Sequence, residues 1–197
     1  MGLILNKLSS PLFLSNWSIF LLLVSLTSCS EIDKNKKLDQ RPNIILIVAD
    51  DLGYADLSSY GGDIETPNID MLATNGLRFS SYHTAPSCAP TRAMLLSGND
   101  NHIAGMGMQD LITDTFGYEG QLSSRIATIP QVLRASGYHT YMAGKWHLGK
   151  TKESNPFQKG FEHSFVLLSG AGNHYDDQGI IKENPISQYT EDGKAIK

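Results

Sequence analysis

Apolar and polar positions are arranged along this chain in blocks that predict a mixed α/β domain. The apolar block 44–49 holds six consecutive apolar residues, four of them β-branched. This pattern is typical of a strand that is covered on both faces. An alternating run at 77–82 predicts a second strand, and 138–143 is a plausible third strand. We therefore expect an α/β fold with a largely parallel central sheet flanked by helices.

Three segments, 66–76, 87–98 and 128–137, carry the start and stop residues of helices. In the first, Thr66 can cap the helix and Gly76 can end it. The other two segments also end in glycine, and both have a proline near the first turn. We expect the apolar face of the first helix to lie in the core; its residues are Ile69, Leu72 and Ala73.

The second predicted helix has a cysteine at its entrance. Cys88 would lie at the positive end of the helix dipole, with Arg92 about one turn further on the same side. This setting attracts an anion, which could be a thiolate, a modified side chain or a ligand. For a lone cysteine, however, the commoner interpretation is a buried structural thiol beside a surface arginine.

Two adjacent carboxylates, Asp50 and Asp51, directly follow the apolar block 44–49. Ligands of open α/β sheets collect at the carboxyl ends of the strands, so these side chains should face a crevice. Adjacent carboxylates repel each other unless a cation or a set of donors neutralises them. Their oxygen atoms suit calcium or magnesium. A solvated turn after the strand explains the pair equally well.

The strand predicted at 138–143 leads into a loop with glycine on both sides, which contains Lys145 and His147. Their spacing places both side chains near one end of the strand. By itself this is a weak indication, because the lysine could be solvated and the histidine could be an ordinary loop residue.

Taken together, three motifs resemble those of the type I sulfatases, the formylglycine-dependent branch of the alkaline phosphatase superfamily. The first is Cys-Ala-Pro-Thr-Arg at 88–92, followed by Leu-Ser-Gly. The second is Ile-Val-Ala-Asp-Asp-Leu-Gly-Tyr at 47–54. The third is Gly-Lys-Trp-His at 144–147, preceded by Gly-Tyr-x-Thr at 137–140. The resemblance extends over 41–197.

This resemblance implies a sulfuric ester hydrolase. A maturation enzyme would oxidise Cys88 to formylglycine, whose hydrate attacks the sulfur of a sulfate monoester and later releases sulfate. The catalytic residues implied are Cys88, Arg92, Lys145 and His147. The metal ligands implied are Asp50, Asp51 and residue 88, with calcium as the usual ion and magnesium as the alternative.

The resemblance also implies that 42–197 is the N-terminal part of a longer catalytic domain. In the family, an Asp-Asn metal pair, a further lysine and the histidine that protonates the leaving group come from later sequence. We therefore expect the α/β fold to be incomplete at the C-terminus. We also expect little or no activity from residues 1–197 alone.

The N-terminal segment predicts export. Residues 1–28 combine Lys7 with a short apolar core at 19–26, which is too short to span a bilayer. The core leads into Leu-Thr-Ser-Cys, which resembles the lipobox of bacterial lipoproteins and would make Cys29 the lipidated first residue. Residues 29–41 would then tether the domain to a membrane, in the periplasm or at the cell surface. An ordinary cleaved signal peptide is the alternative.

Charge and composition exclude some partners. The formal net charge is -4 and the chain has no long basic run, so we expect no nucleic acid partner. The two cysteines have separate expected roles, so we expect no disulfide. His83, His102 and His174 receive no catalytic role, although His174 could line a substrate cleft.

Several functions stay open beside sulfate ester hydrolysis. A phosphodiesterase or phosphonate hydrolase of the same superfamily is the nearest alternative. A non-catalytic tethered fragment is another, and a thiol hydrolase would need a base adjacent to Cys88. Aryl sulfates, sulfated glycans and sulfated steroids are all possible substrates at this stage.

Overall fold

The structure is a computed structural model that describes residues 41–109, 111–176, 178–181, 184–186 and 188–196. The chain divides into two compact units, Met1–Ile47 and Val48–Lys197. The predicted signal segment 1–28, the predicted lipidation site Cys29 and most of the predicted tether lie outside the described residues. Across the described ranges, no helix has both the length and the apolar character needed to cross a membrane.

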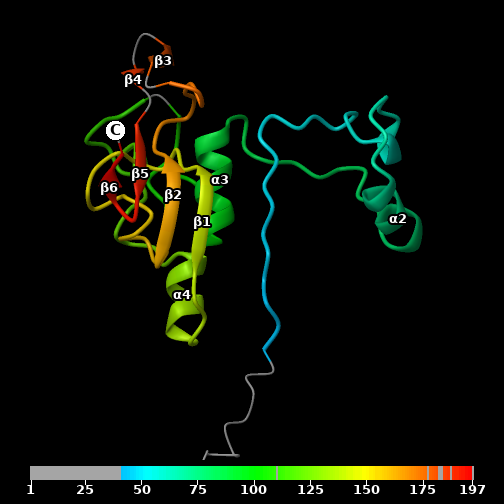
Figure 1. The fold of residues 1–197 in the computed structure, drawn as a ribbon, viewed down its shortest axis with the longest axis horizontal. Coiled ribbons are helices and arrows are strands. Elements are labelled where there is room, and N and C mark those ends of the chain that lie inside the picture. Colours follow the sequence, from blue (N-terminus) through cyan, green and yellow to red (C-terminus); the bar gives the residue numbers. More distant parts are fainter. Residues whose placement is uncertain (1–40, 110, 177, 182–183, 187, 197) are drawn as a thin grey trace, which may run out of the picture. The chain divides into compact units, whose positions relative to one another are not determined.

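The three helices predicted from the sequence are confirmed in the second unit (Figure 1). The α4 helix begins with a capping box, in which the side chains of Thr128 and Gln131 each pair with the other residue's backbone. The α3 helix ends at Gly98, whose φ of 66° is in the left-handed region that favours glycine. The helical segments are η1 (Ser58–Tyr60), α2 (Pro67–Asn75), α3 (Cys88–Ser97) and α4 (Ile129–Ala135).

The main sheet has four strands in the order β1-β2-β5-β6, and β3 and β4 form a separate pair. The mixed α/β class is therefore confirmed. The expected largely parallel sheet is not seen in the described residues, because only β1 and β2 pair in parallel. The strands are β1 (Tyr141–Lys145), β2 (His163–Leu167), β3 (Gln178–Ile181), β4 (Asn184–Ile186), β5 (Tyr189–Glu191) and β6 (Lys194–Ala195).

One apolar core joins α3 to the sheet. Ala89 and Ala93 on α3 are fully buried, and they belong to the same cluster as Val166 on β2 and Trp146, which follows β1. The small α3 side chains allow the helix to approach the sheet closely. The Trp146 ring packs edge-on against Phe161, with the ring centroids 6.3 Å apart, and its Nε1 donates to the Ser154 carbonyl at 2.9 Å. The core therefore fixes the end of β1 against α3.

Two strand predictions are wrong. Residues 44–48 are half to fully exposed, with Ile47 at 87%, and neither 44–49 nor 77–82 forms a strand. An apolar run is buried as a strand only when other strands pair with it and helices cover it. The described residues provide neither for these two segments. The strand predicted at 138–143 does form, but it is displaced and runs from Tyr141 to Lys145.

The expected burial of the α2 apolar face is also wrong. No residue of α2 is buried, and Leu72 is 68% exposed. Periodicity predicts which face of a helix can be buried, but burial itself requires a neighbouring element. The contacts of α2 with the short η1 segment are polar: Thr66 and Ser58 each donate to the Asp70 carboxylate.

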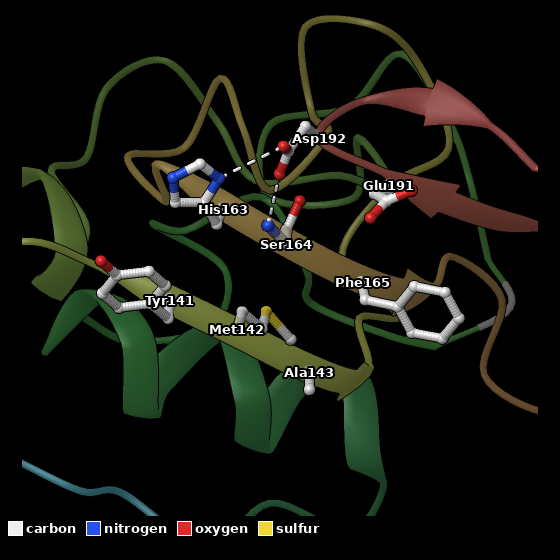
Figure 2. A pocket seen from close by; sticks show the side chains of 8 residues that line it. All are labelled: Tyr141, Met142, Ala143, His163, Ser164, Phe165, Glu191 and Asp192. Atoms are coloured by element: carbon white, nitrogen blue, oxygen red, sulfur yellow. Dashed lines mark hydrogen bonds and ion pairs between the residues drawn. The ribbon is translucent and has the colours of Figure 1, made fainter.

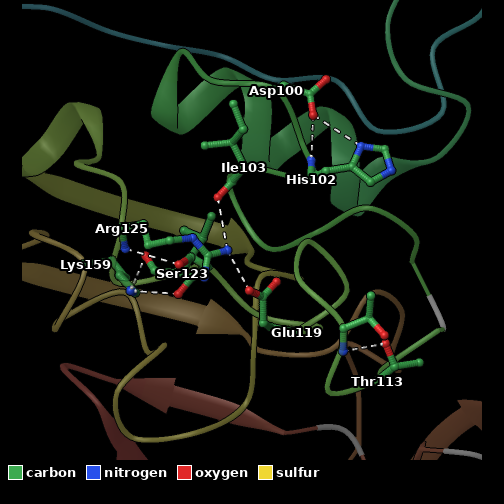
Figure 3. A network of polar contacts seen from close by, with 10 residues as sticks. Asp100, His102, Ile103, Thr113, Glu119, Ser123, Arg125 and Lys159 are labelled. Carbon is green, nitrogen blue, oxygen red and sulfur yellow. Dashed lines mark hydrogen bonds and ion pairs between the residues drawn. The ribbon is translucent and has the colours of Figure 1, made fainter.

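The connection from α3 to α4 is a long loop held by polar contacts (Figure 3). The Arg125 guanidinium donates to Glu119 at 2.6 Å and to the Ile103 carbonyl at 3.4 Å. Lys159 is buried, and its ammonium group donates to the Leu122 carbonyl at 2.9 Å. Burial lowers the pKa of Lys159. These contacts give the loop a defined path without regular secondary structure.

One face of the sheet is covered and the other is open. Tyr141 and Phe165 on the open face are 66% and 53% exposed. The Tyr141 ring stacks on His163, with the centroids 5.5 Å apart. These side chains border a shallow pocket of about 310 Å³ (Figure 2). None of the predicted catalytic residues lines this pocket, so it is separate from the candidate site.

We predict that Trp146→Phe lowers the free energy of unfolding by about 1–3 kcal/mol, because it leaves a small cavity and removes the donor to the buried Ser154 carbonyl. Urea unfolding followed by circular dichroism measures the loss. The control is Tyr175→Phe, at a side chain that is 99% exposed, where we expect a change within about 0.5 kcal/mol. Equal effects of the two variants would contradict this account of the core.

Candidate functional site

Cys88 is the first residue of α3, as the sequence predicts. The preceding residue, Ser87, is extended, with a φ of -143°, and the Thr91 hydroxyl donates to its carbonyl at 2.9 Å. The thiol is free and partly buried. Its sulfur lies 3.0 Å from Oε1 of Gln109 and 3.2 Å from Nδ1 of His147. The side chain at position 88 therefore lies between an amide and an imidazole.

The single thiol proton determines the roles of these two neighbours. In the contact with Gln109, the thiol donates to the carbonyl oxygen Oε1. A neutral thiol has no second proton to give. In the tautomer that carries its proton on Nδ1, His147 donates to the sulfur. The site thus places one acceptor and one donor against residue 88.

Two features place the His147 ring: its own backbone conformation, and the space left by a glycine next to it. Its φ is 58°, a left-handed conformation that is uncommon for residues other than glycine. Its N–H donates to the Leu168 carbonyl at 3.1 Å, just beyond the paired ends of β1 and β2. A Cβ atom at Gly170 would overlap the imidazole ring. Backbone strain of this kind is concentrated at functional sites.

Arg92 connects α3 to the end of β1. Its Nε donates to the Trp146 carbonyl at 2.8 Å, and its Nη2 donates to the Lys145 carbonyl. Burial lowers the pKa of Arg92, while the charges of Asp50 and Cys88 act in the opposite direction. The guanidinium therefore orients the backbone that carries Lys145 and His147, in addition to providing positive charge.

Lys145 and Asp50 form an ion pair. The Lys145 Nζ lies 3.0 Å from both carboxylate oxygens of Asp50. The lysine side chain is mostly buried, whereas that of Asp50 is 54% exposed. The next residue, Asp51, has a left-handed backbone with a φ of 54°. The structure therefore brings the predicted residues together in pairs: Cys88 with His147, and Asp50 with Lys145.

The predicted metal ligands do not form a complete site in this part of the protein. Within the described ranges, no three His, Cys, Asp or Glu side chains are arranged to hold a metal ion. The carboxylates of Asp50 and Asp51 are the type of donor that calcium prefers, but calcium takes about six to eight oxygen ligands. The donor type fits and the donor number does not, so the metal assignment stays a prediction.

The other histidines have contacts of their own. His102 lies between Asp100 and Tyr118, with 3.2 Å to each, and shapes the loop after α3. His174 lies 2.7 Å from the Tyr189 hydroxyl. His83 contacts Ser81 on an exposed segment. None of these contacts involves residue 88.

Sequence reasoning missed Gln109. This residue is 21 positions after Cys88 and belongs to no motif that we recognised. The glycines at 105 and 107 are typical of a tight loop, but they do not show which residue the loop reaches. A helix-start cysteine that faces an imidazole at a strand end is the arrangement expected of a nucleophile site.

Comparison with known proteins identifies the family. The sulfatase family model matches residues 42–195, so this chain belongs to the sulfatase family. The chain is 48% identical over 160 residues to an uncharacterized sulfatase of Schizosaccharomyces pombe, a match that covers 77% of the chain and 29% of that protein. It is 43% identical over 163 residues to an arylsulfatase of Klebsiella aerogenes, with 80% of the chain and 35% of the relative covered.

Solved structures agree with the sequence comparison. The crystal structure of Ps i-CgsB matches with a TM-score of 0.65 and 37% identity, over 80% of this chain and 38% of that one. PsFucS1 sulfatase from Pseudoalteromonas sp. matches with a TM-score of 0.55 and 27% identity, over 82% of this chain and 30% of that one. The chain thus spans about a third of the length of these relatives.

We predict that Arg92→Lys lowers the free energy of unfolding by about 1–3 kcal/mol, because a single ammonium group cannot reproduce the planar fork that reaches both carbonyls. Thermal and urea unfolding measure the loss. The matched control is Arg134→Lys, whose guanidinium is 45% exposed and lies 3.5 Å from Glu162. The control should change stability by less than about 0.5 kcal/mol. If the two variants are equally stable, the fork does not support the site.

Proposed function

We propose that this protein is a sulfuric ester hydrolase that cleaves a sulfate monoester through formylglycine formed from Cys88. The observation that carries the proposal is the position of Cys88 at the start of α3, within 3.2 Å of His147, in a chain of the sulfatase family. A formylglycine-generating maturation enzyme would supply the oxidation. The hydrated aldehyde would then provide the attacking hydroxyl.

The other residues of the site would support a reaction at a crowded anionic sulfur. The sulfate oxygens repel an incoming nucleophile, so the site must neutralise their charge and hold the attacking oxygen in place. Lys145 offers a mostly buried ammonium group, and Nδ1 of His147 lies 3.2 Å from the sulfur of residue 88. Arg92 keeps both groups aligned by holding the backbone between them.

We propose calcium as the ion held in part by Asp50 and Asp51, with magnesium as the alternative. A bound divalent cation supplies positive charge for the sulfate oxygens and favours ionisation of a hydroxyl group. The carboxylate chemistry supports this assignment. In the chain as described, Lys145 occupies the same carboxylate of Asp50, so an ion would compete with the lysine.

For the substrate, we propose a sulfated glycan. The support comes from similar structures: Ps i-CgsB was also solved in complex with k-i-k-neocarrahexaose, at 37% identity to this chain. Another similar structure belongs to work on the metabolism of multiple glycosaminoglycans by Bacteroides thetaiotaomicron, at 32% identity. We also propose that the protein is exported and anchored through lipid on Cys29, which metabolic labelling with a tagged fatty acid would test.

The geometry also favours a second candidate. In the tautomer that carries its proton on Nε2, Nδ1 of His147 lies 3.2 Å from the sulfur of an unmodified Cys88 as the adjacent base that a thiol hydrolase needs. The two candidates differ in the chemical state of residue 88. The intact mass of the protein, made together with the maturation enzyme, distinguishes an aldehyde from a thiol.

The proposal predicts that residue 88 is converted and that Cys88→Ala abolishes turnover. The test uses a chimera in which residues 42–195 replace the matching segment of the Klebsiella aerogenes arylsulfatase. That enzyme supplies the rest of a catalytic domain. We expect this chimera to hydrolyse an aryl sulfate and Cys88→Ala to reduce kcat by at least about 10³-fold. The exposed substitution Gln158→Leu is the control. Full activity in a preparation with only a thiol at residue 88 would refute the proposal and support the thiol hydrolase.

The ion pair predicts an unusual response of calcium binding. Because the Lys145 ammonium occupies the Asp50 carboxylate, Lys145→Met should tighten calcium binding by about two- to fivefold, the equivalent of one partly exposed ion pair. Asp50→Asn should weaken binding. Isothermal titration with calcium chloride measures the calcium affinity of both variants. The exposed substitution Lys152→Met is the control. If Lys145→Met leaves the affinity for calcium unchanged, the ion does not bind at Asp50.

A further inference from the structure

We infer that Gln109 is a positioning residue that stabilises the hydrated form of residue 88. The inference rests on the proposed function, because it concerns the formylglycine that would replace Cys88. Its basis is the contact of 3.0 Å between the Cys88 sulfur and Oε1 of Gln109. No sequence motif assigns a role to this glutamine.

A hydrogen-bond acceptor next to residue 88 distinguishes the aldehyde of formylglycine from its hydrate. A free formylglycine aldehyde has one carbonyl oxygen, which only accepts hydrogen bonds. Water adds across that carbonyl: its oxygen bonds to the carbon and one of its protons moves to the former carbonyl oxygen. The resulting geminal diol has two O–H donors. Oε1 of Gln109 can accept from the diol and not from the aldehyde, so it shifts the equilibrium toward the hydrate.

The two neighbours of residue 88 then match the two hydroxyls of the diol. Gln109 offers an acceptor at 3.0 Å, and His147 offers an N–H at 3.2 Å. Both distances are measured from the Cys88 sulfur, the atom that the hydroxyl oxygens would replace. One hydroxyl would donate to the amide, and the other would accept from the imidazole. Gln109 would thereby fix which hydroxyl keeps its lone pairs free for attack.

The loop that carries Gln109 is built to hold it. Met106 is 2% exposed, and its N–H donates to the Asn101 carbonyl at 2.8 Å. Gly107 donates to the Gly117 carbonyl at 2.6 Å. A Cβ at Gly107 would lie 2.6 Å from the His102 ring, so only glycine allows this close approach. His102 has no other role in the proposed reaction. Its ring borders the loop and thereby directs the chain toward residue 88.

A carboxamide suits this role better than a stronger base. It accepts a hydrogen bond without taking the proton, and it adds no negative charge near a sulfate. A glutamate at the same position would also accept a hydrogen bond, but it would repel the anionic substrate. Gln109→Glu therefore separates hydrate stabilisation, which it keeps, from compatibility with the substrate.

The test measures the hydrate-to-aldehyde ratio in the full 197-residue chain, made together with the maturation enzyme and labelled with carbon-13 at cysteine Cβ. Carbon NMR resolves the diol carbon from the aldehyde carbon, and intact mass reports conversion of residue 88. We expect Gln109→Leu and Gln109→Asn to lower the ratio by about three- to tenfold, which corresponds to the loss of one hydrogen bond. Gln109→Glu should stay within about twofold of the unsubstituted chain.

Each result supports or overturns the inference. A role in packing alone predicts that the glutamate variant is disturbed at least as much as the asparagine variant, which would overturn it. An unchanged ratio in Gln109→Leu, at a level of conversion equal to that of the exposed control Gln158→Leu, overturns the inference and leaves the proposed function intact. A thiol at residue 88 in the unsubstituted chain overturns the proposed function, and the inference with it.

Discussion

The paired hydrogen bonds from Arg92 to the carbonyls of Lys145 and Trp146 are the interaction on which the site depends. They join the second turn of α3 to the last residue of β1 and to the residue that follows it. Cys88 lies one turn before the arginine, and His147 lies two residues after Lys145, so this one junction brings the sulfur and the imidazole within 3.2 Å. The partly buried guanidinium reaches the two carbonyls from two separate nitrogens in one plane, whereas a lysine would have to reach both from a single nitrogen. The arginine is thus a structural requirement of the site before it is a source of charge.

Much of the site could be predicted because its signals are local. The helix starts in the segments 87–98 and 128–137 and the stop at Gly98 depend on residues within one or two turns, and all are confirmed. The strand 44–49 and the core face of α2 failed for a different reason. Their patterns state what each segment can bury, but burial depends on partners, which the described residues do not provide. A local pattern predicts the type of a segment better than it predicts its environment.

The residues that sequence reasoning missed act over long separations. Gln109 reaches Cys88 across 21 positions, and Gly170 leaves space for an imidazole that is 23 positions earlier in the chain. A glutamine has no ionisable group and a glycine has no side chain, so neither residue type indicates chemistry by itself. Both are informative only after the path of the loops is known. Composition and motif identify the reacting groups here, whereas tertiary structure identifies the groups that orient them.

The surroundings of residue 88 fit a hydroxyl group better than a thiol. Sulfur is a weak donor and a weak acceptor, yet its two neighbours are a full-strength amide acceptor and an imidazole donor. A buried polar group with a weak partner loses part of its compensation for desolvation. Oxidation of Cys88 and hydration of the aldehyde would replace the sulfur by two oxygens that can meet both groups. On the proposed mechanism, Oε1 of Gln109 and the imidazole of His147 would each pair with an oxygen of the mature residue.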